Sequence, residues 1–241
     1  SAGFALPVDH PQGPLHSLQF FDKQGEAVHK IYLKKPDDVQ LAAYYALVED
    51  FRAEEQASHF LPEKEVDKKP PLPLAEVDGK GFMQAWSQLK DTHDFHPMLR
   101  KFRVSRTDAL RLARTEYAWQ MPLTVVRYML ELAAKREVPI MVFVGNRGMI
   151  QIHSGPVRKI KMMNDWLNVL DPEFNLHLNQ GGIAECWLVE KPTEDGSVHS
   201  LELYDAEGAT IASFFGARKP GIPQRKDWEQ IIHEIRPLEA V

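Results

Sequence analysis

Two histidines one helical turn apart, His93 and His96, are the side chains in this sequence best suited to chemistry. Three apolar residues, Phe82, Trp86 and Leu89, precede them. From Phe82 to His96 the five residues form a stripe and are separated by steps of four, three, four and three. This spacing predicts one face of a helix that Pro97 interrupts or kinks. An imidazole there is either a core histidine bonded to a carbonyl oxygen, which spacing alone favours, or a metal ligand.

Zinc fits the histidine pair poorly. His-x-x-His supplies two ligands, whereas a structural zinc needs four and a catalytic zinc three, and the chain has neither a His-Glu-x-x-His motif nor a cysteine pair. The remaining metal is iron held in a flat apolar cofactor. Haem requires a neutral imidazole, apolar walls and cations for its two propionates.

Arginine suits the propionate role because its planar fork binds a carboxylate bidentately and stays charged at cellular pH. Arg106 lies in the first turn of an expected helix, Lys191 at the end of an expected strand, and Arg218 after another strand. A solvated surface role is the default for each cation taken singly. His96 also has two interpretations. It caps the helix or faces solvent, or it replaces His93 as ligand of a moving iron.

The elements that must position these residues are helices followed by antiparallel strands. The first part predicts a hairpin over 16–21 and 27–33 and a helix from Asp37 to about residue 53. After the helix predicted by the stripe from Phe82, the later part predicts helices that begin near Ser105 and Pro122 and a closing helix at 227–235. Its predicted strands cover 138–144, 149–153, 160–170, 174–178, 184–190, 199–204 and 209–216. This order is typical of an α+β fold.

The chain contains an internal repeat. Residues 16–25 align with 199–208, apolar position for apolar position, and 47–52 align with 231–236 after a one-residue slip. We therefore expect a duplicated lobe whose first copy is truncated, so that over a hundred residues are missing upstream. The predicted organisation is the tail of the first lobe at 1–56, a stiff proline-rich linker at 57–76 and a complete second lobe at 77–241.

Composition narrows the class of protein. A net charge of −5 gives no reason to expect nucleic acid as a partner. The single cysteine, Cys186, excludes an internal disulfide and indicates a reducing compartment, with the cytoplasm as the default. No run of about 18 apolar residues occurs, so we expect no membrane insertion. The N-terminus lacks the order of a signal peptide, although a truncated start could have lost one.

Three stretches resemble the HemS/ChuS/PhuS family of bacterial haem-utilisation proteins. They are 86–110, which contains both histidines, 146–156 and 166–178. The likeness extends from Asp78 to the C-terminus and, through the first-lobe tail, over 16–52. Aligned by position, the family's axial ligand falls on His93, and its propionate-binding cations and pocket aromatic fall on Arg106, Lys191, Arg218 and Phe143. A distal arginine of that family would lie upstream of this chain.

The resemblance implies haem b as the cofactor and a cytoplasmic protein that holds haem and delivers it to a haem oxygenase or another acceptor. An alternative is a haem-degrading enzyme, which needs an open sixth iron position and an electron source. Since the sequence has no flavin or nicotinamide fingerprint, and its distal group is expected upstream, we expect poor catalysis from this chain. A structural or interaction module without cofactor is the third interpretation.

Overall fold

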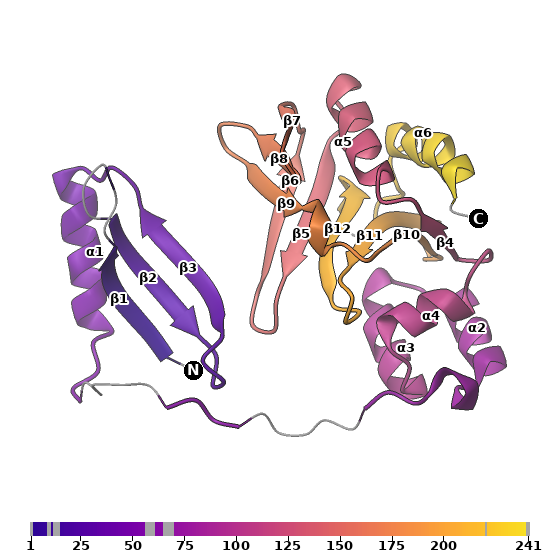
Figure 1. Cartoon of the computed structure of the whole chain (residues 1–241), viewed down its shortest axis with the longest axis horizontal. Helices are drawn as coiled ribbons and strands as arrows, with labels where there is room; N and C mark the ends of the chain where they lie inside the picture. The colour runs from indigo at the N-terminus through magenta and orange to yellow at the C-terminus, as the bar shows by residue number, and fades with distance from the viewer. Residues whose placement is uncertain are drawn as a thin grey trace. The chain divides into compact units, whose positions relative to one another are not determined.

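The computed structural model describes residues 2–8, 11, 15–55, 61–64, 70–219 and 221–239 (Figure 1). The chain divides into two compact units, one of residues 1–68 with 146–149 and the other of 69–145 with 150–241. Helices and antiparallel sheets make up both, which confirms the predicted α+β class. Among the described residues, no helix is both long and apolar enough to cross a membrane.

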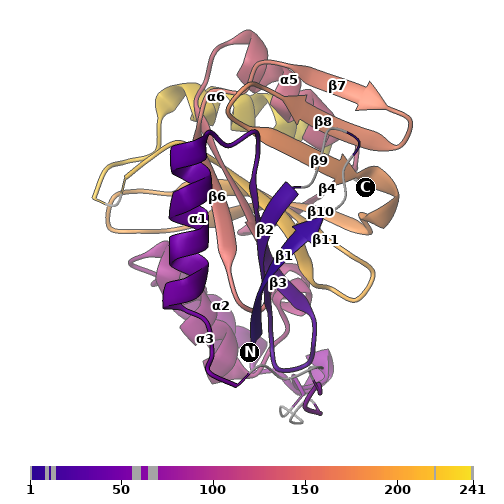
Figure 2. The same ribbon diagram turned by 90° about the vertical axis from the view of Figure 1, so that its left-hand side faces the viewer.

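The first unit is a three-stranded antiparallel sheet with one helix beside it (Figures 1 and 2). Its elements in chain order are β1 (Ala2–Val8), β2 (Leu15–Phe21), β3 (Ala27–Leu33) and α1 (Asp38–Asp50). Asp37 caps α1 as predicted, and the Tyr44 hydroxyl on α1 donates to the Ser17 carbonyl oxygen (3.0 Å) on β2. Strand β1 was not predicted.

The repeated sequence folds in the same way twice. Asp22 directly follows β2, and its carboxylate accepts two backbone N–H groups of the turn. Asp205 does the same after β11 (Val198–Tyr204). Gly25 and Gly208 take matching left-handed conformations, with φ of 86° and 78°, which only glycine adopts without strain. Each hairpin also shifts register at the equivalent position, so the structure supports the predicted duplication.

The second unit is built on a six-stranded antiparallel sheet in the order β4-β10-β11-β12-β5-β6. Its strands besides β11 are β4 (Ala118–Met121), β5 (Ile140–Gly145), β6 (Ile150–Gly155), β10 (Glu185–Lys191) and β12 (Thr210–Gly216). A smaller antiparallel sheet contains β7 (Ile160–Met163), β8 (Trp166–Leu170) and β9 (Asn175–Asn179). The predicted strand at 160–170 is therefore two strands, which turn at Asn164 with φ of 52°. Strand β4 was missed.

Helices cover both faces of the six-stranded sheet (Figure 1). On one face lie α5 (Val125–Lys135) and α6 (Lys226–Ile235), which bury the larger hydrophobic cluster. On the other face a second cluster is formed with α2 (Gly79–Ser87), α3 (Phe95–Phe102) and α4 (Arg106–Leu112). This second helical layer contains the segment with both candidate histidines.

The predicted linker is only partly described, since 57–60 and 65–69 lie outside the described residues. Residues 61–64 and 70–73 have no helix or strand, and Leu74–Glu76 forms one 3₁₀ turn, η1. The lobe boundaries at 56 and 77 stay predictions.

Candidate functional site

The single helix predicted through both histidines is wrong. Helix α2 ends at Ser87, and a 3₁₀ turn, η2 (Thr92–Asp94), precedes α3. The break occurs because Asp91 caps a new start: its side chain accepts the His93 backbone N–H, while its own N–H donates to Asp94. Pro97 lies in the first turn of α3, where its missing N–H costs no helical bond, so it does not kink the helix.

This break separates the predicted stripe into buried and exposed members. Phe82, Trp86 and Leu89 are buried in the core, whereas the His93 side chain is 87% exposed. The core-histidine alternative is therefore wrong for His93. His96 is exposed too, at the start of α3.

Asp91 holds the His93 ring in one orientation. Its Oδ1 lies 2.5 Å from His93 Nδ1 and 2.7 Å from the His93 backbone nitrogen. The two hydrogen bonds from His93, backbone first, lower the pKa of Asp91, which is therefore an acceptor at neutral pH. Since a carboxylate can only accept, Nδ1 is the donor in this contact, and Nε2 has no hydrogen-bond partner in the part of the chain that the structure describes.

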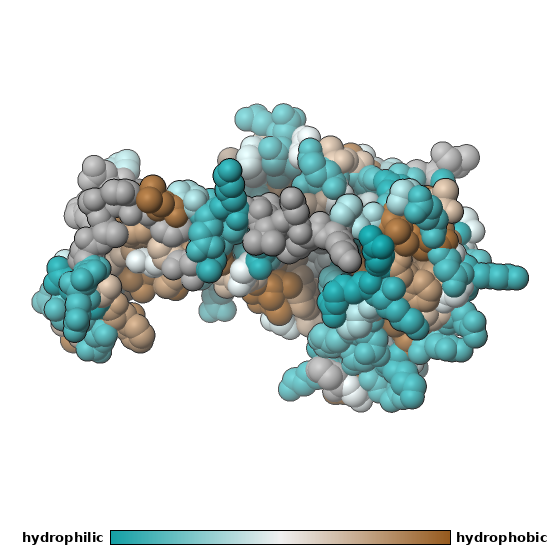
Figure 3. Space-filling model, turned by 90° about the horizontal axis from the view of Figure 1, so that it is seen from below, coloured by the Kyte–Doolittle hydropathy of each residue, from teal (hydrophilic) through white to brown (hydrophobic). Residues whose placement is uncertain are grey.

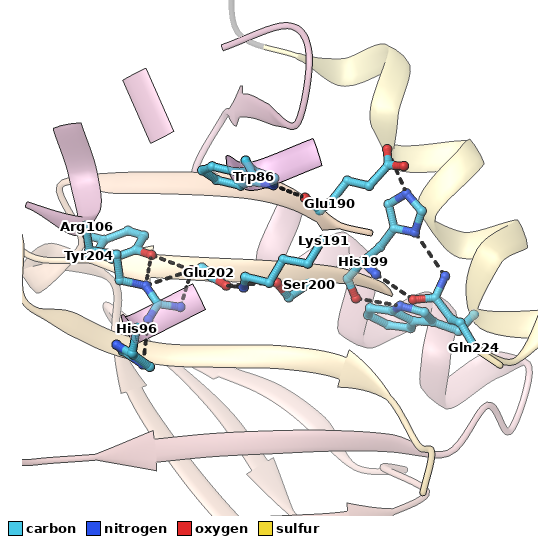
Figure 4. Close-up of polar contacts among 11 residues, drawn as sticks. Trp86, His96, Arg106, Glu190, Lys191, His199, Ser200, Glu202, Tyr204 and Gln224 are labelled. Atoms are coloured by element: carbon cyan, nitrogen blue, oxygen red, sulfur yellow. Dashed lines mark hydrogen bonds and ion pairs between the residues drawn. The ribbon is translucent and has the colours of Figure 1, made fainter. Parts of the chain in front are cut away.

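A buried cluster of charges lies on β10 and β11, with Glu202 at its centre (Figure 4). Lys191 Nζ donates to Glu202 Oε1 at 2.7 Å, and Arg106 donates to Oε2 through Nε at 3.1 Å and Nη2 at 2.8 Å. The Tyr204 hydroxyl also donates to Oε2, and Ser200 donates to Oε1. Every oxygen of this carboxylate is therefore satisfied without solvent.

The charge states in this cluster follow from its contacts. Burial disfavours ionisation of Glu202, but Arg106 and Lys191 outweigh it and hold the pKa of Glu202 well below its usual range. Burial lowers the pKa of Lys191, and Glu202 offsets part of that effect. Burial and Glu202 raise the pKa of Tyr204, so it stays a phenol that donates. Two of the three predicted propionate cations are thus brought together on one internal anion.

Arg106 also reaches the second histidine. Its Nη1 lies 3.2 Å from His96 Nε2. Because a guanidinium can only donate, Nε2 of His96 is the acceptor. Partial burial, with Arg106 and Lys191 nearby, lowers the pKa of His96, so the ring is neutral at physiological pH.

Arg218 stands apart from this cluster. Its Nη2 lies 3.9 Å from Asp195 Oδ2, and its positive charge is among the influences that lower the pKa of Asp91. Only 10% of its side chain is exposed, and its Nη1 is buried without a hydrogen-bond partner among the described residues. A buried guanidinium N–H in this state can still donate to a carboxylate.

Phe143 belongs to an apolar, partly open stretch of the six-stranded sheet. Its ring meets Phe215 edge to face at 5.2 Å, and it pairs in register with Ile152. Ile150 and Ile152 lie on the same face of β6 and are each more than half exposed. Figure 3, the view from below, shows brown apolar side chains near the centre of the picture, in line with the β5–β6 hairpin of Figure 1. This face can wall a flat apolar ligand.

Phe95 and Phe215 connect this wall to the charge cluster. The Lys191 ammonium lies 4.7 Å from the centre of the Phe95 ring and 5.9 Å from that of Phe215. Phe95 lies between His93 and His96 in the sequence and is the first residue of α3. Four of the predicted residues are thus joined by one chain of contacts. His96 contacts Arg106, and Arg106 and Lys191 both bond to Glu202. Lys191 also lies near the ring of Phe215, which contacts Phe143.

Sequence reasoning missed Asp91, Glu202, Tyr204 and Phe215. A signal existed for Glu202, because it is an acidic residue in the apolar strand 199–204 of the repeat, where the first copy has the neutral Gln19. Asp91 has the N-cap residue type three before Asp94. Among the described residues, no group of three or more His, Cys, Asp and Glu could hold a bare metal ion.

Comparisons with known proteins identify the family of this chain. The family described as the haemin-degrading HemS.ChuX domain matches residues 1–51 and 103–235, segments that contain Arg106, Phe143, Lys191 and Arg218. The hemin transport protein HemS of Yersinia enterocolitica is 35% identical over 240 residues, which are 98% of this chain and 67% of that protein.

Solved structures give the same result. Holo-PhuS, a heme-binding protein from Pseudomonas aeruginosa, is 45% identical with a TM-score of 0.92, over 97% of this chain and 67% of that one. ChuS, an E. coli heme oxygenase, is 33% identical with a TM-score of 0.84, over 98% and 68%. ChuX, at 12% identity and a TM-score of 0.55, shares the fold alone. The chain therefore belongs to the HemS/ChuS/PhuS family of haemin-utilisation proteins.

Proposed function

We propose that this protein binds haem b through Nε2 of His93 and delivers it to an acceptor, such as a haem oxygenase. The observation that carries the proposal is the state of His93: an exposed imidazole, oriented by Asp91, whose Nε2 is left open. A haem protein that delivers its cargo needs a site that also releases, and one histidine bond meets that need better than two strong axial ligands. The lone buried thiol of Cys186 is consistent with a cytoplasmic location.

The other predicted residues have distinct proposed roles. Arg218 binds a propionate through its buried, unsatisfied Nη1, and the N–H groups of Arg106 that Glu202 does not occupy bind the second. Lys191 acts through charge, because its ammonium is buried and bonded to Glu202. Phe143 supplies part of the apolar wall.

Replacement of His93 tests the proposal directly. We expect His93→Ala to lower haem affinity by about 100-fold or more, since even the residues that orient a metal ligand contribute about 10- to 100-fold. The measurement is a haem titration followed by the Soret band. His233→Ala, at an exposed histidine on α6, is the matched control and should bind as wild type. No saturable Soret shift in wild type would favour a module without cofactor and end the proposal.

Removal of Asp91 tests how His93 is held. We expect Asp91→Ala to weaken haem binding by about 10- to 100-fold, because the ring loses its fixed tautomer and orientation. Asp91→Asn should recover much of this loss, since its amide oxygen can still accept from His93. Equal affinities of wild type and Asp91→Ala in the same titration would show that the contact does not support ligation.

His96 is proposed as the alternate iron ligand, because it lies only three residues from His93, at the start of α3. On this basis His93→Ala retains weakened haem binding with an altered spectrum. Absence of any histidine-bound species in that variant would remove the alternate role and leave the axial role of His93 intact.

Haem degradation is a second candidate, favoured by the similarity to ChuS, a heme oxygenase. The test is to trap verdohaem or biliverdin from the haem-loaded protein with an electron donor and catalase present. Product under these conditions would indicate enzymatic turnover, whereas product only without catalase would indicate coupled oxidation by free peroxide.

A further inference from the structure

The two histidines differ in what their Nε2 atoms meet. Asp91 fixes His93 from the Nδ1 side, which leaves Nε2 available for a ligand. The Arg106 guanidinium, by contrast, approaches His96 at Nε2, the atom that would face an iron one turn along the chain. An iron ion needs the lone pair that this hydrogen bond uses, so His96 cannot ligate while Arg106 stays in place.

Arg106 has little freedom to leave. Its Nε and Nη2 bond to Glu202 and Tyr204 on β11, 96 and 98 residues further along the chain, and these contacts aim Nη1 at His96. Glu202 has no exposed side-chain surface and is itself held by Lys191 and Ser200. The position of Nη1 is therefore set by a carboxylate that touches neither histidine.

We propose that Glu202 determines which histidine takes the iron: it anchors Arg106, and the anchored guanidinium keeps His96 Nε2 hydrogen-bonded while His93 Nε2 stays open. This inference rests on the proposed haem function and adds a specificity-determining residue to it. Glu202 is a positioning residue, because it acts on the ligands only through Arg106. His96 becomes available when Arg106 turns away from it.

The first test uses the protein without haem, so it does not depend on the proposed function. Nitrogen-15 NMR of the imidazoles should show His96 with its proton on Nδ1, as an Nε2 acceptor requires. In Arg106→Met, where Lys191 and Glu202 remain as a balanced pair, the His96 proton should move to Nε2, the nitrogen that free imidazole side chains prefer to protonate. His93 is the internal control and should keep its Nδ1 proton in both proteins.

Glu202 is tested by two variants in the same experiment. Glu202→Gln removes the charge that holds Arg106, and Glu202→Asp keeps the charge but draws the anchor back by one methylene group. Both should shift His96 toward the Nε2 proton, so the prediction stays testable if the Gln variant does not fold. Wild-type His96 with its proton on Nε2, or no change in Arg106→Met and Glu202→Asp, would overturn the inference.

The second test uses hemin dimethyl ester, whose uncharged side arms remove any propionate contact of Arg106. In the His93→Ala background, Arg106→Met should tighten binding of the ester by about 10- to 100-fold. The reason is that the charge-assisted hydrogen bond from Arg106 to His96 no longer has to break before His96 can bind iron. In the His96→Ala background, where no His96 hydrogen bond has to break, the same change should give no such gain. Equal effects in both backgrounds would refute the inference, and failure of wild type to bind haem would instead refute the proposed function.

Discussion

Glu202→Leu should lower the free energy of unfolding by about 3–5 kcal/mol, since it leaves Arg106 and Lys191 as buried cations without their counter-charge. Urea unfolding followed by tryptophan fluorescence measures the loss. Lys191→Met is the milder comparison, because it leaves the Arg106–Glu202 pair intact. A loss below about 1 kcal/mol for Glu202→Leu would show that solvent reaches the cluster in place of Glu202.

A triple variant separates the cost of breaking the cluster from its net worth. Replacement of Arg106 and Lys191 by Met together with Glu202 by Leu should give a stability near wild type or above it, because no buried charge is left unpaired. The same protein should bind haem poorly, since it lacks Arg106, a proposed propionate ligand, and the charge of Lys191. A triple variant as unstable as Glu202→Leu would mean that packing, not charge, explains the single variant.

The wild type and the triple variant should also differ in how their stability depends on pH. A carboxyl whose pKa is lowered by folding contributes stability that is present above its unfolded pKa, about 4.3 for Glu, and is lost as the pH falls from there toward the folded pKa. The pKa of Glu202 is lowered in this way, so the wild type should lose stability on acidification through this range. The triple variant lacks that contribution, and its stability should fall less over the same range.

Much of the fold followed from local signals in the sequence. Strand alternation, turn residues and caps predicted both repeat hairpins, the capped start of α1 at Asp37 and the start of α4 at Ser105. These features depend on residues close together in the chain, and periodicity and capping report on such contacts. The repeat added long-range information, because one copy's geometry can be checked against the other.

The missed strands depend on distant partners. β1 pairs with β2 in the register that β10 makes with β11, so that Ala2 opposite Phe21 matches Glu185 opposite Tyr204. That equivalence is visible only once the pairing is known. β4 is four residues long and is stabilised by its pairing to β10. Neither segment carries a strong signal of its own.

In the candidate site, too, the features that were missed depend on residues far apart in the chain. The resemblance to the family, rather than residue type alone, singled out His93 and the cations. It did not give their partners, because the contacts of Glu202 with Arg106 span 96 residues. The repeat shows why the charge cluster belongs to the second copy. Gln19 stands where Glu202 does and Val8 where Lys191 does, so the described part of the first copy lacks the anion and the cation at these two positions.

Trp86→Ala should have the second large effect, since this indole holds the layer of helices that carries both histidines. The side chain is fully buried, its Nε1 donates to the Glu190 carbonyl oxygen on β10 at 3.0 Å, and its ring meets Phe95 edge to face at 4.7 Å. Truncation should cost about 3–5 kcal/mol through the cavity that it leaves. Because Phe95 begins α3 directly after η2, the cavity should also loosen His93 and lower haem affinity.

Two variants test whether packing at this one position causes both effects. Trp166→Ala removes the same side chain where it is 44% exposed, and should change stability by less than about 0.5 kcal/mol. Trp86→Phe keeps most of the ring contacts but loses the hydrogen bond to Glu190, so its loss should be nearer 1–2 kcal/mol, on the order of one buried acceptor left unpaired. Urea unfolding and haem titration on the same samples would relate stability to affinity. A large stability loss with unchanged haem affinity would mean that Asp91 alone orients His93.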